Sequence, residues 1–164
     1  MVSKSNLPKI ANYQAKIAAP FAVLGVRTEK DWLVGIDYLS INTPLLAPLN
    51  PFAREVCKQL RSYLIEPNFV FDLSLYIDGT AHQRRVWQAI QVIRSGETSS
   101  YAEIATQVHS APRAVGGACG ANKLPIVIPC HRVIAKNGEL GGFMNASKGH
   151  PLEIKRWLLR HEYT

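Results

Sequence analysis

The first third of the chain alternates short apolar runs with turn residues, a pattern typical of β-strands. Runs at 21–26 and 32–36 predict two strands joined by a turn at 28–31. The segment 13–18 is a candidate third strand. We therefore expect a small antiparallel sheet near the N-terminus.

Between residues 52 and 64 the apolar positions recur every three or four residues, which predicts a helix. Asn50 suits its N-cap, and Pro51 suits its first turn because the missing N–H needs no partner there. The run 69–75 indicates a further extended segment. The N-terminal sheet is thus expected to pack with one helix.

The dipeptide Asp78-Gly79 predicts a boundary between an N-terminal domain, 1–78, and a C-terminal domain, 79–164. Beyond it the apolar spacing becomes helical, with one stripe over 86–93 and a last helix starting near Pro151. Together the two parts predict an α/β (α+β) fold whose C-terminal domain is mostly helical.

Two short helices in this domain are expected to form a helix-turn-helix. Ser100 and Glu103 have the spacing of a capping box, which predicts that a helix begins directly after Ser100. Residues 109–111 form a short connection, and Pro112 fits the first turn of the next helix. Helices joined in this way commonly bind nucleic acid.

The second of these helices is unusually rich in glycine. Gly116, Gly117 and Gly120 fall within five positions, although each glycine inside a helix costs roughly 0.5 to 1 kcal/mol relative to alanine. One explanation is tight packing against a neighbouring helix. The other is close approach of a DNA groove, which the nearby Arg113 favours.

The charge of the chain is concentrated in its second half. Of the net +7, residues 1–79 contribute +1 from eight basic and seven acidic side chains, and residues 80–164 contribute +6 from eleven and five. A local positive field attracts polyanions, among which DNA and RNA are the commonest. A soluble basic surface without a partner remains the alternative.

Composition excludes several other classes of protein. No apolar run approaches the roughly 20 residues of a membrane span, and the N-terminus lacks the apolar core of a signal peptide. The three cysteines form no C-x-x-C pair, so we expect reduced thiols rather than a disulfide framework. The expected compartment is the cytoplasm, or the nucleus if the source is a eukaryote.

The segment 126–133 contains the candidate nucleophile. A β-branched run predicts a strand that fails at Pro129, which leaves Cys130 at a break in regular structure. A thiol attacks carbon as the thiolate, and the adjacent His131 can take its proton directly or through water. Cys57 and Cys119 are expected to be small buried hydrophobes, and no second ligand lies at metal spacing from Cys130.

The second half of the chain contains a series of short motifs around this cysteine. They are Gly79-Thr80, Val86-Trp87, Gly96-Glu-Thr-Ser-Ser-Tyr101, Arg113-Ala-Val-Gly-Gly-Ala118, Asn122, Leu124-Pro125, Pro129-Cys-His-Arg-Val133 and Arg156-Trp-Leu-Leu-Arg-His-Glu162. In order and spacing they resemble the O6-alkylguanine-DNA alkyltransferases, also called methylated-DNA–protein-cysteine methyltransferases. The likeness is strong over 79–143 and 152–162 and weaker in the N-terminal part.

The resemblance implies catalytic roles for five residues. Cys130 would accept the alkyl group. His131 would bridge to it through a water, and Glu162 would orient His131. Asn122 would hold the turn that presents the cysteine. Tyr101 would contact the flipped nucleotide and help to protonate the departing guanine.

A second set of residues is implied in DNA binding. The family places its helix-turn-helix in the minor groove, which suits a helix of small residues. Arg113 would fill the gap that the flipped base leaves in the stack. The other residues implied in DNA binding are Ala114, Gly116, Gly117 and Arg132.

The base pocket departs from the family pattern. Val133, Phe143 and Met144 are its implied lining residues. In the family an aromatic residue, a small residue and Gly-Gly-Leu follow the active site, whereas segment 142–152 keeps the aromatic, lacks the glycine pair and is about three residues longer. The cysteine ligands of the zinc that some members bind are also missing. The departure leaves the range of alkyl groups open.

The resemblance implies direct repair of O6-alkylguanine, with O4-alkylthymine as a second substrate, by irreversible transfer in a single turnover. It implies a monomer acting on double-stranded DNA without membrane, cofactor or metal. Two alternatives stay open: a non-catalytic binder of alkylated DNA, and a helix-turn-helix transcription regulator. The first lacks the family cysteine, and the second needs sequence-specific sites.

Overall fold

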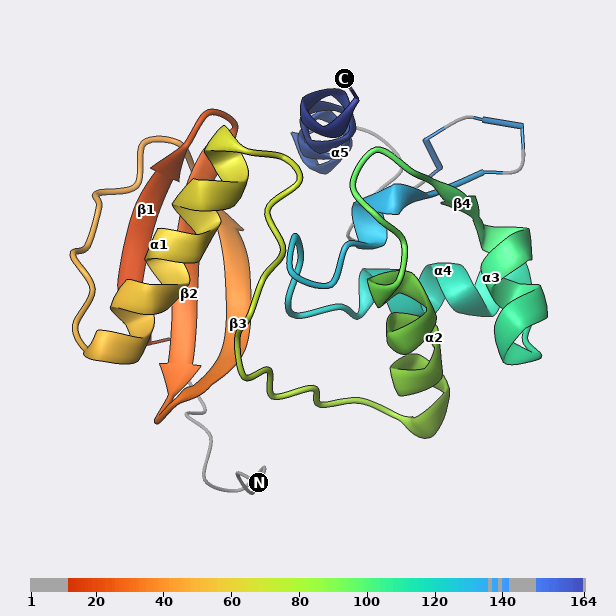
Figure 1. Cartoon of the computed structure of the whole chain (residues 1–164), viewed down its shortest axis with the longest axis horizontal. Coiled ribbons are helices and arrows are strands. Elements are labelled where there is room, and N and C mark those ends of the chain that lie inside the picture. The colour runs from red at the N-terminus through yellow and green to blue at the C-terminus, as the bar shows by residue number, and fades with distance from the viewer. Residues whose placement is uncertain (1–11, 136, 139, 142–149, 164) are drawn as a thin grey trace. The chain divides into compact units, whose positions relative to one another are not determined.

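The computed structural model describes residues 12–135, 137, 138, 140, 141 and 150–163. It divides into two compact units, one ending at Asp78 and the other beginning at Gly79 (Figure 1). Among the described residues, no helix has the length and apolar character needed to cross a membrane. The predicted mixed fold, an antiparallel sheet with a helix followed by a mostly helical part, is confirmed.

The first unit is built on a three-stranded antiparallel sheet. Its strands are β1 (Ala15–Ala19), β2 (Ala22–Glu29) and β3 (Trp32–Leu39), in the order β1-β2-β3. The turn predicted at 28–31 is narrower than expected, because Glu29 already pairs with Trp32. Lys30 lies within this turn, and its backbone φ of 54° is in the left-handed region.

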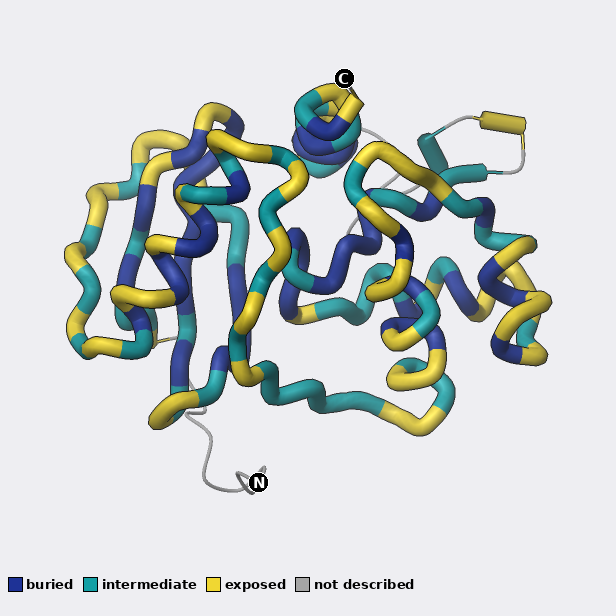
Figure 2. Tube along the Cα trace, in the orientation of Figure 1, coloured by how far each residue is buried: buried dark blue, intermediate teal, exposed yellow. Residues whose placement is uncertain are grey.

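Helix α1 (Pro51–Ile65) packs on β1 and β2, as Figure 1 shows. The Asn50 side chain accepts a hydrogen bond from the Ala53 N–H at 2.8 Å, so the predicted N-cap is present. The helix turns one apolar face inward, and Figure 2 shows the alternation of buried and exposed positions along it. The sheet and this helix form the core of the first unit.

The extended segment predicted at 69–75 does not become a strand. Its only ladder contact in the described structure is an isolated bridge between Leu33 and Leu75. The backbone N–H and C=O of Asp72 bond instead to the side-chain amide of Gln59, at 2.9 and 3.0 Å. A helix side chain therefore satisfies the groups that a neighbouring strand would otherwise bind.

Helices dominate the second unit. Its elements are α2 (Ala81–Gln91), β4 (Ser99–Ser100), α3 (Tyr101–Val108), α4 (Pro112–Gly120), a 3-10 turn (Cys130–Arg132), β5 (Val133–Ile134) and α5 (His150–Glu162). The helices α2, α3 and α4 pack against one another, while β4 pairs in parallel with β5. Helix α2 ends at Gln91, earlier than its apolar stripe predicts, with Ile93 buried just beyond it.

Helices α3 and α4 form the predicted helix-turn-helix. The Ser100 side chain accepts from the Glu103 N–H at 3.0 Å, and the Glu103 side chain accepts from the Ser100 N–H at 3.1 Å. This reciprocal pair is the predicted capping box. The helix ends at Val108, and its C-cap His109 has a left-handed backbone (φ 55°) that turns the chain toward α4.

The prediction of a strand ahead of Cys130 is wrong. Residues 126–128 form turns, with the Ile128 N–H donating to the Leu124 carbonyl at 2.8 Å and Ile126 at a φ of 74°. Both isoleucines are buried. The β-branched run thus reflects burial rather than strand pairing, because side-chain contacts decide where such residues are favourable.

Candidate functional site

Cys130 begins the 3-10 turn and is only 4% exposed. Asn122, just beyond α4, donates from Nδ2 to the Ile128 carbonyl at 2.9 Å and to Cys130 Sγ at 3.2 Å. Its Oδ1 accepts from the Leu124 N–H at 2.9 Å. One amide therefore shapes the turn and touches the sulfur, as the predicted role of Asn122 requires.

A second cysteine, Cys119, lies beside the same turn, and its carbonyl accepts a hydrogen bond from the Asn122 N–H at 3.2 Å. Cys119 lies in the last turn of α4 and is partly exposed. The neighbouring Cys119 and burial raise the pKa of Cys130 well above its ordinary value. The neighbouring Cys130 lowers the pKa of Cys119. The sequence predicts only a buried small hydrophobe at this position.

His131 and Glu162 form a buried pair. His131 is fully buried, Glu162 is 3% exposed, and the distance from Nε2 to Oε2 is 2.7 Å. Burial lowers the pKa of His131, so the imidazole is neutral at neutral pH. A carboxylate only accepts, which assigns the single ring proton to Nε2 and leaves Nδ1 as an acceptor. Nδ1 is buried with no hydrogen-bond partner among the described residues.

Arg132 is turned inward, away from the role in DNA binding that the resemblance implies. Its Nε and Nη2 donate to the two Glu162 oxygens at 2.9 and 3.0 Å, and its Nη1 donates to the Ile93 carbonyl at 2.7 Å. A guanidinium engaged on all three nitrogens has little left to offer a phosphate. Its observed task is to fix Glu162.

Lys155 is a site residue that sequence reasoning missed. It is fully buried on α5, and its Nζ donates to the carbonyls of Val133 and Leu140, at 2.8 and 2.5 Å, and to the Tyr101 hydroxyl at 3.4 Å. Burial lowers its pKa to about 8. Its spacing of three from the apolar Leu158 was the available signal, since that places both on one helix face.

Tyr101 and Val133 lie next to this ammonium. Burial raises the pKa of Tyr101, so the side chain remains a phenol. A Cβ on Gly141 would come within 2.9 Å of the Tyr101 ring, and Gly141 has a φ of 68°, so glycine suits this position on both counts. Val133 is buried, whereas Phe143 and Met144 lie outside the described residues.

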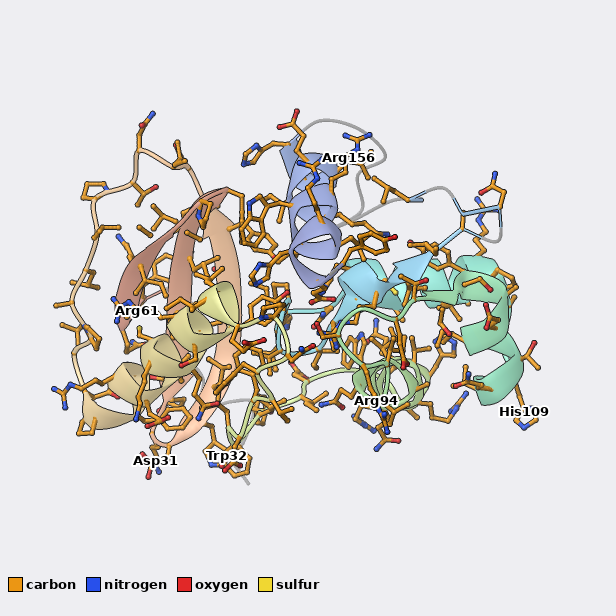
Figure 3. The ribbon with its side chains drawn as sticks, turned by 45° about the horizontal axis from the view of Figure 1, so that its top comes forward. Asp31, Trp32, Arg61, Arg94, His109 and Arg156 are labelled. Atoms are coloured by element: carbon orange, nitrogen blue, oxygen red, sulfur yellow. The ribbon has the colours of Figure 1, made fainter. Side chains whose placement is uncertain are left out.

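The predicted DNA-contacting face of α4 is open. Arg113, Ala114 and Gly117 are exposed and Gly116 is half-buried. A Cβ on Gly117 would meet nothing within 4 Å, so packing against another helix does not explain this glycine. Figure 3 shows His109, the exposed C-cap of α3, projecting from the end of that helix.

Within the described part of the chain, no cluster of three or more potential metal ligands is present. The described site contains the Cys130 thiol, a neutral imidazole held by a carboxylate, and a phenol held by a buried ammonium. Such a set can generate a thiolate nucleophile and protonate a leaving group.

Comparisons with known proteins agree with this chemistry. Residues 81–164 match the family described as 6-O-methylguanine DNA methyltransferase, DNA binding domain. A methylated-DNA–protein-cysteine methyltransferase of Methanosarcina barkeri is 42% identical over 157 residues, covering 92% of this chain and 96% of that protein. The chain belongs to this methyltransferase family.

Two further family members show the same likeness. The constitutive methylated-DNA–protein-cysteine methyltransferase of Bacillus subtilis is 46% identical over 114 residues, covering 68% of this chain and 67% of that protein. The crystal structure of Mycobacterium tuberculosis OGT in complex with DNA is 36% identical, with a TM-score of 0.74 over 90% of this chain and 91% of that one. The likeness to that structure extends over both units.

Proposed function

We propose that this protein repairs DNA directly, by transferring the alkyl group from O6 of a guanine to Sγ of Cys130. The contact of Cys130 with Asn122, beside the buried His131–Glu162 pair, is the observation that supports it most. The names of the family members, methylated-DNA–protein-cysteine methyltransferase, describe the same reaction.

The first step is removal of the Cys130 proton. A raised pKa keeps Cys130 a thiol at neutral pH, so the site needs a base. The Nδ1 of His131 is that base, directly or through one water, because Glu162 fixes the proton on the other ring nitrogen. The carboxylate then stabilises the imidazolium that forms.

The second step is displacement at the alkyl carbon. The C–O6 bond breaks as the C–S bond forms, and guanine leaves as its neutral tautomer once it gains a proton. The Tyr101 phenol donates that proton, and Lys155 stabilises the phenolate left behind. The product is a thioether, which no nucleophile of this site can hydrolyse, so each molecule acts once.

The alkylated base must leave the duplex to reach a buried thiol, which costs a few kcal/mol. Helix α4 supplies the means, since its exposed glycine face can approach a groove and Arg113 can fill the gap in the stack.

Arg113→Ala should slow transfer from duplex DNA far more than reaction with the free base O6-benzylguanine. Equal losses on the two substrates would remove Arg113 from base flipping.

Intact-protein mass spectrometry tests the transfer. After incubation with a duplex containing O6-methylguanine, the reduced protein should gain the mass of one methylene, located on Cys130 by peptide mapping. Cys57→Ser should gain it too, whereas Cys130→Ala should bind the duplex and gain nothing. Binding without any gain in wild-type mass would identify a non-catalytic binder. A footprint that follows sequence rather than the lesion would identify a regulator.

A further inference from the structure

Helix α4, which the proposed function places against DNA, has few of the features that stabilise a helix from within. In the described structure its N-cap, Ala111, makes no side-chain capping bond, although serine, threonine, asparagine and aspartate are the residues that cap well. Three of its nine residues are glycine, the poorest helix former after proline. Contacts from outside the helix must therefore hold it in shape.

Helix α2 packs against α4 and is itself firmly capped (Figure 1). Thr80 Oγ1 accepts from the Gln83 N–H at 3.1 Å, and Gln83 Oε1 accepts from the Thr80 N–H at 3.0 Å. Trp87 of α2 donates from Nε1 to the Ala118 carbonyl of α4 at 2.8 Å, in a buried hydrogen bond. This bond fixes the C-terminal half of α4 on α2.

A second hydrogen bond from α2 reaches the other end of α4. His82, in the first turn of α2, has its Nε2 2.7 Å from Oγ of Ser110, and the pair is partly buried. Either group can be the donor, because a hydroxyl both donates and accepts. Ser110 lies in the connection between α3 and α4 and directly precedes the N-cap Ala111. Helix α2 thus holds α4 at both ends.

The residue that depends most on this second bond is Arg113. It is the second residue of α4, so it keeps its position only while the first turn of the helix is formed. That turn is closed by the Val115 N–H, which donates to the Ala111 carbonyl at 3.0 Å. Since Ala111 offers no capping side chain, release of Ser110 would let the turn fray and displace Arg113.

We propose that His82 is a positioning residue for DNA recognition. By binding Ser110 it does the work of the missing N-cap and keeps Arg113 aligned for insertion into the duplex. The proposal rests on the role proposed above for Arg113 and adds a residue on which that role depends. His82 acts through α4 and takes no part in the transfer at Cys130.

Loss of the His82–Ser110 bond should have a limited and specific effect. One hydrogen bond of this kind shifts an equilibrium about fivefold. The apparent affinity for a ligand falls in proportion to the fraction of molecules in the binding-competent form. Duplex binding should therefore weaken about fivefold, whereas reaction with a free base, which needs no insertion of Arg113, should be unchanged.

His82→Ala in the full-length protein tests this proposal. Exchange of the Val115 amide proton, followed by NMR, should quicken about fivefold. Affinity for an O6-methylguanine duplex, measured by fluorescence anisotropy, and single-turnover transfer below saturation should fall by the same factor. Reaction with free O6-benzylguanine should keep its wild-type rate.

Three variants separate positioning from a general loss of stability. His82→Gln keeps a side-chain amide that can reach Ser110 and should retain most of the duplex rate. In the His82→Ala protein, Ala111→Ser supplies the missing N-cap and should restore both the amide exchange and the duplex rate. Gln88→Ala, at an exposed position of the same helix, should change neither.

The same loss on duplex and free base, unchanged exchange at Val115, or no restoration by Ala111→Ser would overturn the proposal. The proposed function can fail separately. If exchange and duplex affinity respond to His82→Ala as expected but even the wild type transfers no alkyl group to Cys130, the role of His82 stands and the alkyl transfer alone is refuted.

Discussion

Glu162 supports two side chains with one carboxylate. It accepts from His131 and, through both oxygens, from Arg132. Glu162→Gln replaces one acceptor oxygen by a donor, which leaves a largely buried guanidinium without its counter-charge and lets the imidazole take the wrong tautomer. Removing one partner of a buried pair costs about 3–5 kcal/mol. The loss of general-base catalysis should slow transfer about 10²-fold.

Urea unfolding and single-turnover transfer measure the two effects of Glu162→Gln. The matched control on α5 is Glu153→Gln, because Glu153 is exposed and its nearest ion-pair contact, with His150, is at 3.9 Å. That control should stay within about 0.5 kcal/mol of the wild type, as exposed pairs contribute little. Equal behaviour of the two variants would contradict the role assigned to Glu162.

The buried Lys155 makes the stability of the folded protein depend on pH. Its pKa is about 8 in the folded protein and near 10.5 when exposed to water. Between these values the unfolded chain holds a proton that the folded chain has lost, so the contribution of Lys155 to stability rises with pH. The gain across this window is on the order of 3 kcal/mol.

Lys155→Met should isolate that gain. The difference in unfolding free energy between wild type and variant, measured in urea at pH 7 and pH 10, should shift in favour of the wild type at the higher pH. Lys58→Met, an exposed position on α1, should show a difference that stays constant. A constant difference for Lys155→Met as well would mean that Lys155 is hydrated and does not serve Tyr101 as proposed.

At the scale of elements, sequence patterns predicted the structure correctly where a side chain hydrogen-bonds to the backbone of its own helical turn. The Asn50 cap and the Ser100–Glu103 box were predicted and are present, because both bonds lie within one helical turn. Segment 126–128 was predicted as a strand and forms a turn, and segment 69–75, predicted as extended, makes only an isolated bridge. Side chains outside these segments, those of Gln59 and Asn122, bind backbone groups within them, and hydrophobic periodicity does not reveal such partners.

The glycines of helix α4 lower its stability and leave one of its faces open. A Cβ at Gly117 meets no atom within 4 Å, so Gly117→Ala should stabilise the free protein by roughly 0.5 to 1 kcal/mol through helix propensity. The same methyl group should weaken DNA binding, since it holds the helix away from the groove. Chemical denaturation and binding to a lesion duplex give the two numbers.

Ser62→Ala on α1 is the control for Gly117→Ala, since it also replaces a residue of lower helix propensity by alanine. It should raise stability slightly and leave DNA affinity unchanged. If Gly117→Ala gains stability without losing affinity, α4 is not the helix that meets DNA.

At the scale of the whole molecule, the uneven charge predicts which half governs DNA affinity. The residues after Gly79 hold a net +6 and those up to it only +1. Each phosphate contact releases counterions, so the logarithm of the binding constant should fall linearly with the logarithm of salt concentration, by about 0.9 for each phosphate neutralised. Duplex without a lesion should show the same dependence as lesion duplex, because phosphate contacts do not depend on the base sequence.

Two substitutions locate the charges that matter. Lys123 is exposed directly after α4, where the backbone of a bound groove should pass, and Lys123→Gln should reduce the salt slope by about one. Arg61→Gln removes the same charge from α1 and should leave the slope unchanged. Fluorescence anisotropy with a duplex over a series of salt concentrations measures both. Equal reductions would show that affinity follows net charge alone, and the assignment of DNA binding to the helix-turn-helix would then lose its electrostatic support.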